Sequence, residues 1–336
     1  MDQSVSPTQR LLDPDAVARY VAASLGRTAG VTDCGPLTGG GFAAVWWVEL
    51  SDGRRVVLKV GPAPAVPLLR YERGLIAAEA RYLRRVADRA PAVPVPPLLH
   101  HGSDPVLGDW LLTGLLPGRT LPALTGAGID AGPARAELGA ALAALHRITG
   151  DRYGYDDAHR TSGPTWRSAF LAILDDLLAD AADWQVPLPV PAARIRALVA
   201  RHAEVLDAVR RPALLHFDGW AGNVLAVTGP DGIPRLSGLV DGERHLYGDP
   251  LMDLVSPLLS RRAEDEPEDA VLRGYRSAAT LALDAGARRR LGLYRLHLYL
   301  LMTVEMPSRG MTLSSHPGRS AWLAELLAGE LADLGS

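Results

Sequence analysis

Cysteine, lysine and asparagine are almost absent from this sequence of 336 residues. The one cysteine, Cys34, excludes an internal disulfide framework and a cysteine-rich zinc site, which fits a reducing, cytoplasmic setting. The first residues lack a basic start followed by an apolar stretch, so no secretory signal is predicted. The most apolar late segment, residues 291–306, contains charged residues and is too short to span a membrane, so we expect a buried helix there.

A surplus of positive charge is also lacking. The chain has 35 basic and 38 acidic residues, and this balance disfavours nucleic acid as a partner. With 48% hydrophobic and 22% charged residues, the composition is that of a globular protein and not of a disordered chain. The length is sufficient for two lobes, each with its own core.

Lys59 is the one lysine of the chain and Asn223 is its one asparagine, so arginine carries nearly all of the positive charge. Together with abundant alanine, glycine, leucine and proline, this bias indicates a GC-rich genome. A position that keeps lysine or asparagine against such a bias is expected to need the chemistry of that side chain. We therefore treat both residues as candidates for function.

The chemistry of the chain is concentrated in residues 214–254. His216, Asp218 and Asn223 form a His-x-Asp-x4-Asn pattern after an apolar segment, and Asp241 follows a second apolar segment. Phosphoryl transfer from a nucleotide needs a carboxylate to orient the attacking hydroxyl and hard oxygens to hold Mg²⁺. Asp218 suits the first task, and Asn223 and Asp241 suit the second. Turn residues at 228–232 predict a hairpin that brings them together.

This stretch resembles the aminoglycoside phosphotransferase and choline-kinase-like family, whose members are relatives of the protein kinases. HFDGWAGN stands where the family has an HGDxxxxN-type loop, and VDGERHLYGDPLMDL stands where it has an IDWE-type segment. The chain departs from this pattern at Phe217 and Gly242, and neither departure removes a proposed catalytic oxygen. The resemblance implies an α+β, two-lobed protein-kinase-like fold, with a small β-rich N-lobe and a larger, mostly helical C-lobe.

We expect the chain to divide into an N-terminal helical extension (1–34), an N-lobe (35–116) and a C-lobe (117–336). The extension contains a predicted helix over residues 12–26, with Asp13 as its N-cap and Gly26 as its end. The N-lobe begins with a β-hairpin over residues 38–60 that turns at 51–53. Further predictions are a helix over 71–89, a strand over 109–116 and a helix over 133–148.

Gly39, Gly40 and Gly41 precede β-rich sequence, whereas a dinucleotide-binding fingerprint must open a helix, so we exclude a Rossmann fold. The chain also lacks a Walker-type GxxxxGK[ST] sequence. The resemblance instead implies that these glycines form a glycine-rich loop whose backbone approaches the phosphates of a nucleotide. Lys59, on the next strand, would then contact the α- and β-phosphates.

Two further parts of the nucleotide site follow from the resemblance. Glu79 is preferred over Glu72 as the partner of Lys59, because it lies just before a proline-rich segment, as in the family. The hinge between the lobes would lie near Thr113 to Leu115, where backbone groups would bind the base. Glu79 on a solvated helix face is the alternative.

Several polar residues are assigned to structure or left open. The resemblance implies that Asp253 braces the catalytic loop (residues 216–223). We expect His216 to hold this loop through hydrogen bonds and His146 to be structural. Glu243 would assist the metal or the substrate, and Glu305 is a weaker candidate for the same role. Residues 151–210 would build part of the acceptor site. Candidates that would receive a cationic acceptor or line its pocket are Asp175, Asp176, Asp180, Asp183, Tyr155, Trp166 and Arg167, although a solvated helix face explains most of the aspartates.

The implied reaction transfers the γ-phosphate of ATP or GTP, with Mg²⁺, to a hydroxyl of a small molecule. The acceptor would be an antibiotic of the aminoglycoside, nucleoside or peptide class, in resistance or self-resistance. A kinase of a sugar, an amino alcohol or a fructosamine-like metabolite is the alternative, and Trp220 resembles the fructosamine-kinase branch. A nucleotide-binding scaffold without an acceptor stays open. A protein kinase is disfavoured because no APE-type segment follows Asp241. No membrane partner is expected.

Overall fold

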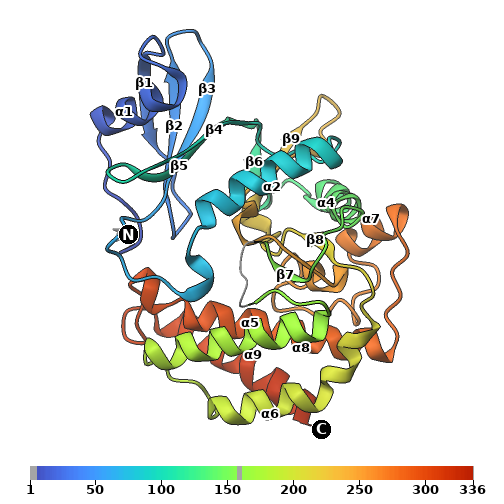
Figure 1. Cartoon of the computed structure of the whole chain (residues 1–336). Coiled ribbons are helices and arrows are strands. Elements are labelled where there is room, and N and C mark those ends of the chain that lie inside the picture. The colour runs from blue at the N-terminus through green and yellow to red at the C-terminus, as the bar shows by residue number, and fades with distance from the viewer. Residues whose placement is uncertain (1–5, 157–160, 336) are drawn as a thin grey trace.

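The computed structural model describes residues 6–156 and 161–335 and has a β-rich N-terminal lobe and a larger helical C-terminal lobe (Figure 1). The predicted α+β kinase-like architecture is therefore confirmed. Residues 1–5 of the predicted extension lie outside the described residues. Within the described ranges, no helix is both long and apolar enough to cross a lipid bilayer.

One antiparallel sheet of five strands forms the N-lobe, in the order β1-β2-β3-β5-β4. These strands are β1 (Val31–Pro36), β2 (Ala44–Leu50), β3 (Arg55–Val60), β4 (Leu98–Asp104) and β5 (Gly108–Gly114). The predicted hairpin over 38–60 is confirmed as β2 and β3. The strand β1 begins inside the segment assigned to the N-terminal extension and ends two residues beyond it, so that segment supplies part of an edge strand as well as a helix.

Helices α1 (Pro14–Leu25) and α2 (Leu75–Arg89) cover opposite faces of this sheet. Successive side chains of a strand point to opposite faces. Trp110 and Leu112 of β5 pack in the α1 cluster, whereas Leu111 between them packs against the start of α2. On β3, Leu58 and Val60 belong to the α1 side. Lys59 must therefore face α2, and this alternation decides which helix supplies its partner.

Helix α1 begins and ends as predicted, since the carboxylate of Asp13 accepts from the backbone of the first turn and Gly26 ends the helix with φ +89°. The helix predicted over 71–89 is broken near its start. Gly74 has φ +77°, a left-handed conformation that glycine adopts without strain, so α2 begins only at Leu75. Residues 70–72 instead form a separate short 3-10 turn, η1 (Arg70–Glu72).

The C-lobe is built from helices around one large core. The helices are α3 (Leu121–Thr125), α4 (Gly132–Leu145), α5 (Trp166–Asp183), α6 (Ala192–His202), α7 (Ala270–Ala278), α8 (Ala285–Val304) and α9 (Pro317–Gly335). The predictions of a helix over 133–148 and a buried helix over 291–306 are confirmed by α4 and α8. Figure 1 shows α5, α6, α8 and α9 gathered below the strands labelled β7 and β8.

Two small sheets position the catalytic segments. One joins β6 (Arg119–Thr120), β9 (Val224–Thr228) and β10 (Pro234–Leu239), and the other joins β7 (Gly154–Tyr155), β8 (Ala213–Leu215) and β11 (Leu246–Gly248). The predicted hairpin is β9 and β10. Short 3-10 turns, namely η2 (Ala203–Ala208), η3 (Ala221–Asn223), η4 (Gly242–Arg244), η5 (Pro250–Leu254) and η6 (Pro307–Arg309), connect the remaining elements.

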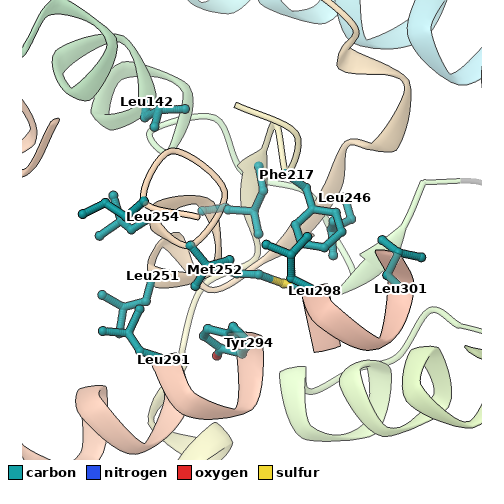
Figure 2. Packing of buried hydrophobic residues seen from close by; sticks show 14 of the residues in the cluster. Leu142, Phe217, Leu246, Leu251, Met252, Leu254, Leu291, Tyr294, Leu298 and Leu301 are labelled. Carbon is teal, nitrogen blue, oxygen red and sulfur yellow. The ribbon is translucent and has the colours of Figure 1, made fainter. Parts of the chain in front are cut away.

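The core of the C-lobe lies directly beneath the catalytic loop. Figure 2 shows Phe217 of this loop among Leu246, Met252 and Leu298, which come from β11, η5 and α8. Burial of such side chains stabilises by roughly 1.5–3 kcal/mol each. The loop is thus anchored on apolar packing, and its polar residues are left to face the space between the lobes.

Candidate active site

Asp253 holds the start of the catalytic loop. Its carboxylate accepts hydrogen bonds from the backbone N–H of His216, at 2.8 Å, and from that of Phe217. His146 Nε2 lies 3.0 Å from the same carboxylate, and Asp253 is buried. The structure places Asp253 and His146 where structural residues were expected. Phe217 adopts φ +64°, a left-handed conformation that is costly outside glycine, and its buried ring stacks on His297 at 5.7 Å.

Hydrogen bonds within the loop fix the position of Asp218. The backbone N–H of Asp218 donates to His216 Nδ1 at 3.2 Å, and Asn223 Nδ2 donates to the backbone carbonyl of Asp218 at 2.9 Å. These contacts leave the carboxylate of Asp218 turned toward Arg244, whose Nε lies 3.8 Å from Oδ2. Burial raises the pKa of Asp218 to about 6, and the charge of Arg244 opposes this rise. The group is suited to accept a proton near neutral pH.

Three carboxylates converge on Lys59. Its Nζ lies 2.6 Å from Glu79 Oε2 and 2.9 Å from Asp241 Oδ1, and it also donates to Glu243. Burial of Lys59 lowers its pKa, but Asp241, Glu243 and Glu79 outweigh burial and hold the pKa well above its usual range. The preferred pairing with Glu79 is present. The alternative, Glu72, lies in η1 and pairs instead with Arg309, whose Nη1 is 2.6 Å from Glu72 Oε1.

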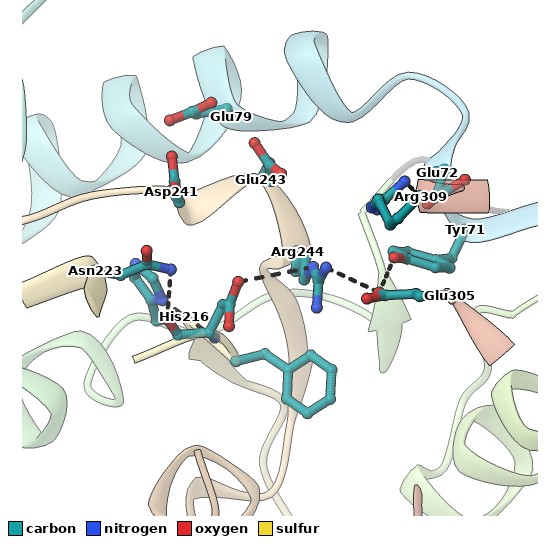
Figure 3. A network of polar contacts seen from close by, with 12 residues as sticks. Tyr71, Glu72, Glu79, His216, Asn223, Asp241, Glu243, Arg244, Glu305 and Arg309 are labelled. Atoms are coloured by element: carbon teal, nitrogen blue, oxygen red, sulfur yellow. Dashed lines mark hydrogen bonds and ion pairs between the residues drawn. The ribbon is translucent and has the colours of Figure 1, made fainter. Parts of the chain in front are cut away.

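Asn223 and Asp241 lie next to each other, at the two ends of the β9–β10 hairpin (Figure 3). Because the amide nitrogen of Asn223 is engaged by the loop, its oxygen stays available as a ligand. Asp241 has φ +62° and a side chain that is 38% exposed, and only Oδ1 contacts Lys59. Burial works against its charge, but the ammonium of Lys59 keeps the pKa of Asp241 below its usual value. This pair of hard oxygens fits a Mg²⁺ ion.

A second set of carboxylates, Glu79, Asp241 and Glu243, also has oxygens within 4.8 Å of one another. The ammonium of Lys59 already lies among these oxygens. A metal in their midst would meet that charge at close range, so the arrangement favours Lys59 as the resident cation. Asn223 and Asp241 then remain the predicted ligand pair.

The glycine loop has open space and is held from two sides. A side chain at Gly39 or Gly40 would touch nothing within 4 Å, and Gly39 has φ +118°. Gln9 donates to the carbonyl of Gly40 at 3.1 Å, which ties the N-terminal segment to the loop. On the other side, Cδ of Arg309 lies 3.3 Å from where a Cβ of Gly41 would be. The loop therefore lies between the N-terminal segment and Arg309, with open space at Gly39 and Gly40.

The predicted hinge lies at the end of β5, where Thr113 is buried and pairs with Val57 of β3. The backbone N–H of Leu115 donates to the carbonyl of Arg55 at 3.1 Å. This N–H is engaged within the lobe, so binding of a base near Leu115 would have to use other backbone groups. The role predicted for Thr113 and Leu115 stays a prediction.

The sequence of the chain matches the model of the phosphotransferase enzyme family over residues 33–293. The chain belongs to this family. No curated protein matches it in sequence. Among solved structures, it is similar to a candidate fructosamine-3-kinase from Thermobifida fusca, with 23% identity, a TM-score of 0.65, and coverage of 95% of this chain and 100% of the other.

Two antibiotic phosphotransferases have a similar fold. A thermostable aminoglycoside phosphotransferase APH(4)-Ia in complex with ADP and hygromycin B is 19% identical, with a TM-score of 0.60 and coverage of 94% of this chain and 98% of that one. A macrolide 2'-phosphotransferase type I is 17% identical, with a TM-score of 0.58 and coverage of 97% and 98%. At these identities the likeness establishes the fold of this phosphotransferase and leaves its acceptor open.

Three of the four aspartates predicted to receive a cationic acceptor are engaged by arginines in this phosphotransferase. Asp175 pairs with Arg196, and Asp180 and Asp183 pair with Arg70. These pairs join the helices of the C-lobe to one another and to the N-lobe. Asp176 and Asp180 line a cavity of about 290 Å³ beneath α2, and this cavity also borders Glu243 and Tyr155.

The three other acceptor candidates have different surroundings. Trp166 is fully buried and donates to the hydroxyl of Tyr294 at 2.7 Å, so it belongs to the core and not to a pocket wall. Arg167 pairs with Asp207 on the surface. Tyr155 lines the cavity and stacks with Tyr71 at 6.4 Å. Of these three, only Tyr155 lies beside a space that a ligand can enter.

The main residues missed by sequence reasoning are arginines. Arg244 of η4 lies beside Asp218, and its Nη2 is 2.8 Å from Glu305 Oε1 at the end of α8. Tyr71 also donates to Glu305, and its ring lies 5.7 Å beneath the guanidinium of Arg244. Arg244 stands three residues after Asp241, which is the one signal that the sequence held. Nothing in the sequence relates Arg309 to Gly41.

Proposed function

We propose that this phosphotransferase transfers the γ-phosphoryl group of ATP or GTP to a hydroxyl group of a small molecule. The observation that carries the proposal is the meeting of two sets of residues from distant parts of the chain. Lys59 and Glu79 come from the N-lobe, and Asp218, Asn223 and Asp241 come from the C-lobe. Such a set positions phosphates and stabilises charge, which is most of what phosphoryl transfer requires of a protein.

Each residue has a role in this proposal. Asp218 orients the acceptor hydroxyl and takes its proton, because its carboxylate is fixed by the loop and has a raised pKa. Lys59 contacts the donor phosphates, and Glu79 holds Lys59. Asn223 and Asp241 would hold Mg²⁺, which neutralises phosphate charge when bound.

The division of the chain follows the same roles. Residues 35–116, with Gly39, Gly40, Gly41, Thr113 and Leu115, would bind the nucleotide. Residues 117–336 would carry catalysis and bind the acceptor. Residues 1–34 would support the N-lobe through α1, and their contact with the glycine loop is consistent with this role. We place the reaction in the cytoplasm.

Two acceptor classes agree with the fold. One is an antibiotic, of the aminoglycoside, nucleoside or peptide class, and the similar structures of an aminoglycoside and a macrolide phosphotransferase support an antibiotic in general. The other is a metabolite, and the similar structure assigned as a fructosamine kinase supports it. A scaffold without an acceptor would not need the metal pair, so the presence of Asn223 and Asp241 argues against one.

A nucleotide titration and an acceptor screen test the proposal. Binding of AMP-PNP is measured with and without Mg²⁺, since an enzyme of this kind should depend on the metal. ATP or GTP is then incubated with hydroxyl-bearing antibiotics, sugars and amino alcohols, and phosphorylated products are detected by mass spectrometry. Metal-independent nucleotide binding without any product would contradict the proposal.

The variant Asp218→Ala tests the assigned base. We expect the turnover number to fall by about 10²- to 10⁴-fold, because a positioned base typically contributes this much. Nucleotide binding should persist, since Asp218 lies outside the cluster around Lys59. Asp15→Ala, on the exposed face of α1, is the control. Near-normal turnover of Asp218→Ala would remove Asp218 from its role.

A further inference from the structure

Three arginines from separate elements lie close to one another next to Asp218: Arg244 is beside Asp218, and the charge of Arg244 reaches both Arg309 and Arg319. Arg244 belongs to η4, Arg309 to η6 and Arg319 to the first turn of α9. Figure 3 shows Asn223 and Asp241 on one side of Arg244, and Glu305, Tyr71 and Arg309 on the other. Arg309 therefore lies beyond Arg244 from the proposed metal ligands, and Arg319 lies close enough to Glu305 and Arg244 for their charges to affect its pKa.

All three arginines have unused hydrogen-bond donors. Within the described part of the chain, Arg244 Nε, Arg309 Nη2 and Arg319 Nε are buried N–H groups without a hydrogen-bond partner. The side chains of Arg244 and Arg309 are only 14% and 7% exposed. A buried guanidinium normally satisfies its donors, because an unpaired charged donor is costly. Three such donors on neighbouring arginines indicate a ligand that supplies oxygen acceptors.

The carboxylates near these arginines are already engaged. Glu305 pairs with Arg244, and Glu72 pairs with Arg309. Arg319 has no carboxylate partner among residues 6–156 and 161–335, although Glu305 and Arg244 lie close enough to influence its pKa. Burial, with Arg244 nearby, holds the pKa of Arg319 below its usual value. The acidic side chains here thus offer little to a polycation.

The location of Arg309 links this cluster to the transfer site. Its side chain contacts the position of Gly41, and its guanidinium lies 5.2 Å from the ring centre of Phe42, next in the loop. Arg244 lies 3.8 Å from Asp218 at the other end. The cluster therefore reaches from the glycine loop to the carboxylate that would orient the acceptor hydroxyl.

We propose that the acceptor carries an oxyanion, a carboxylate or a phosphate, near the hydroxyl that is phosphorylated, and that Arg244, Arg309 and Arg319 bind this oxyanion. The planar fork of a guanidinium matches the paired oxygens of either group. The inference rests on the proposed function and deepens it, since it names the class of acceptor. It favours an acidic or phosphorylated metabolite, or an acidic antibiotic, over a polycationic aminoglycoside.

Sulfate binding tests the anion site without requiring turnover. The protein is first saturated with Mg²⁺ and AMP-PNP, so that the donor phosphate site is filled, and sodium sulfate is then titrated calorimetrically. We expect saturable binding that Arg319→Gln weakens by about tenfold or more, as the loss of one charged hydrogen bond would predict. Arg194→Gln is the matched control, because Arg194 is an exposed arginine at the same third position of a helix, α6.

The outcomes of this titration are distinguishable. If AMP-PNP binds with Mg²⁺ but sulfate does not, the anion site is refuted and the proposed function stands. If sulfate binds equally to the unchanged protein and Arg319→Gln, the assignment to these arginines is wrong. If AMP-PNP does not bind with Mg²⁺, the proposed function itself fails.

Turnover measurements then show whether the oxyanion is a carboxylate or a phosphate. They also show whether the arginines bind the acceptor or the phosphoryl group of the donor. Glycerol, glycerate, glycerol 3-phosphate and kanamycin are compared with ATP and Mg²⁺, and one of the two anions should have the highest kcat/KM. Arg319→Gln should raise the KM of that anion by about tenfold with little change in kcat. A fall in kcat alone would assign the arginines to the transferred phosphoryl group, and a preference for kanamycin or glycerol would also refute the proposal. If none of the four reacts, the sulfate titration decides.

Discussion

His297 is a core residue whose surroundings disfavour its protonated form. Burial lowers its pKa to about 4, and within the described residues neither ring nitrogen has a hydrogen-bond partner. Its ring packs between Phe170 and Phe217, each at 5.7 Å. The neutral imidazole thus acts as an aromatic filler beneath the catalytic loop, and it also borders the cavity under α2.

This environment predicts a pH dependence of stability. The native pKa lies below the unfolded value, so between about pH 6.5 and pH 4 the unfolded chain binds more protons and stability falls as the pH falls. The loss approaches about 3 kcal/mol below pH 4. In urea unfolding at several pH values, His297→Leu should flatten this part of the curve. His316→Leu, at an exposed position, should leave the slope unchanged; equal slopes for all three proteins would refute the assignment.

Among the elements, the catalytic loop combines a strained backbone conformation at Phe217 with close packing of the Phe217 ring. Phe217 stands where the family pattern has glycine, and its φ of +64° is one that glycine adopts freely. A non-glycine residue there costs roughly 1–2 kcal/mol. The ring is 1% exposed, and deleting a buried aromatic side chain costs about 3–5 kcal/mol. Packing therefore outweighs strain.

Substitution by glycine makes this balance measurable. Phe217→Gly should lower the free energy of unfolding by about 2–4 kcal/mol, although it removes the strain. Gln185→Gly is the matched comparison, because Gln185 has φ +53° and an exposed side chain. Its stability should change by less than about 1 kcal/mol, since relief of strain and the greater freedom of the unfolded chain nearly cancel. An unchanged or increased stability of Phe217→Gly would contradict the account.

The proposed phosphoryl transfer also depends on the contact between β3 and α2. With Glu79 in place, Lys59 is shared among three carboxylates, and removal of Glu79 would leave Lys59 to Asp241 and Glu243. Lys59 would then compete more strongly with a metal at Asp241.

Glu79→Gln should weaken binding of AMP-PNP with Mg²⁺ by roughly tenfold, the equivalent of one altered ion pair. Isothermal titration at fixed Mg²⁺ measures the change. Glu325→Gln, on the exposed side of α9, should bind nucleotide normally. Stronger or equal binding by Glu79→Gln would show that this carboxylate does not position Lys59.

At the scale of the whole molecule, the short turn η1 joins the lobes. Its three residues contact three parts of the C-lobe: Arg70 pairs with Asp180, Tyr71 donates to Glu305, and Glu72 pairs with Arg309. Glu72 is completely buried, and burial raises its pKa despite the nearby charge of Arg309. These contacts lie beside the active site, so the spacing of the lobes and the geometry of the site depend on the same residues.

A double-mutant cycle across this junction measures its strength. Arg309→Gln leaves the carboxylate of Glu72 buried without a cation, which should cost about 3–5 kcal/mol of stability. Glu72→Gln in the same chain should recover part of that loss, because the buried charge is then gone. Chemical unfolding of the two single variants and the double variant gives the coupling energy. Strictly additive losses would mean that the two side chains do not interact.

The nearness of Asp218, Asn223 and Asp241 could be predicted from the sequence, because these residues flank a single predicted hairpin. The place of Lys59 beside them was implied by the family resemblance, since Lys59 lies 182 positions before Asp241. The strand pattern around Lys59 and the apolar segments before Asp218 and Asp241 predict the local structure that carries these side chains. The biased composition also marks Lys59 and Asn223 as candidates for function. The helix α1, the hairpins and the buried helix α8 were predictable for the same reason. Periodicity and turn residues are properties of short segments.

Only the tertiary structure decided which arginines gather near Asp218, Glu305 and Gly41. Arg244, Arg309 and Arg319 come from three elements spread over 76 positions of the chain, and no local pattern distinguishes them from the other arginines. From the sequence, the acidic residues of α5 were candidates for binding a cationic acceptor. In the fold, several of them pair with arginines from other elements. A charge acquires its role from the charges packed against it, and that packing exists only when the lobes are folded together.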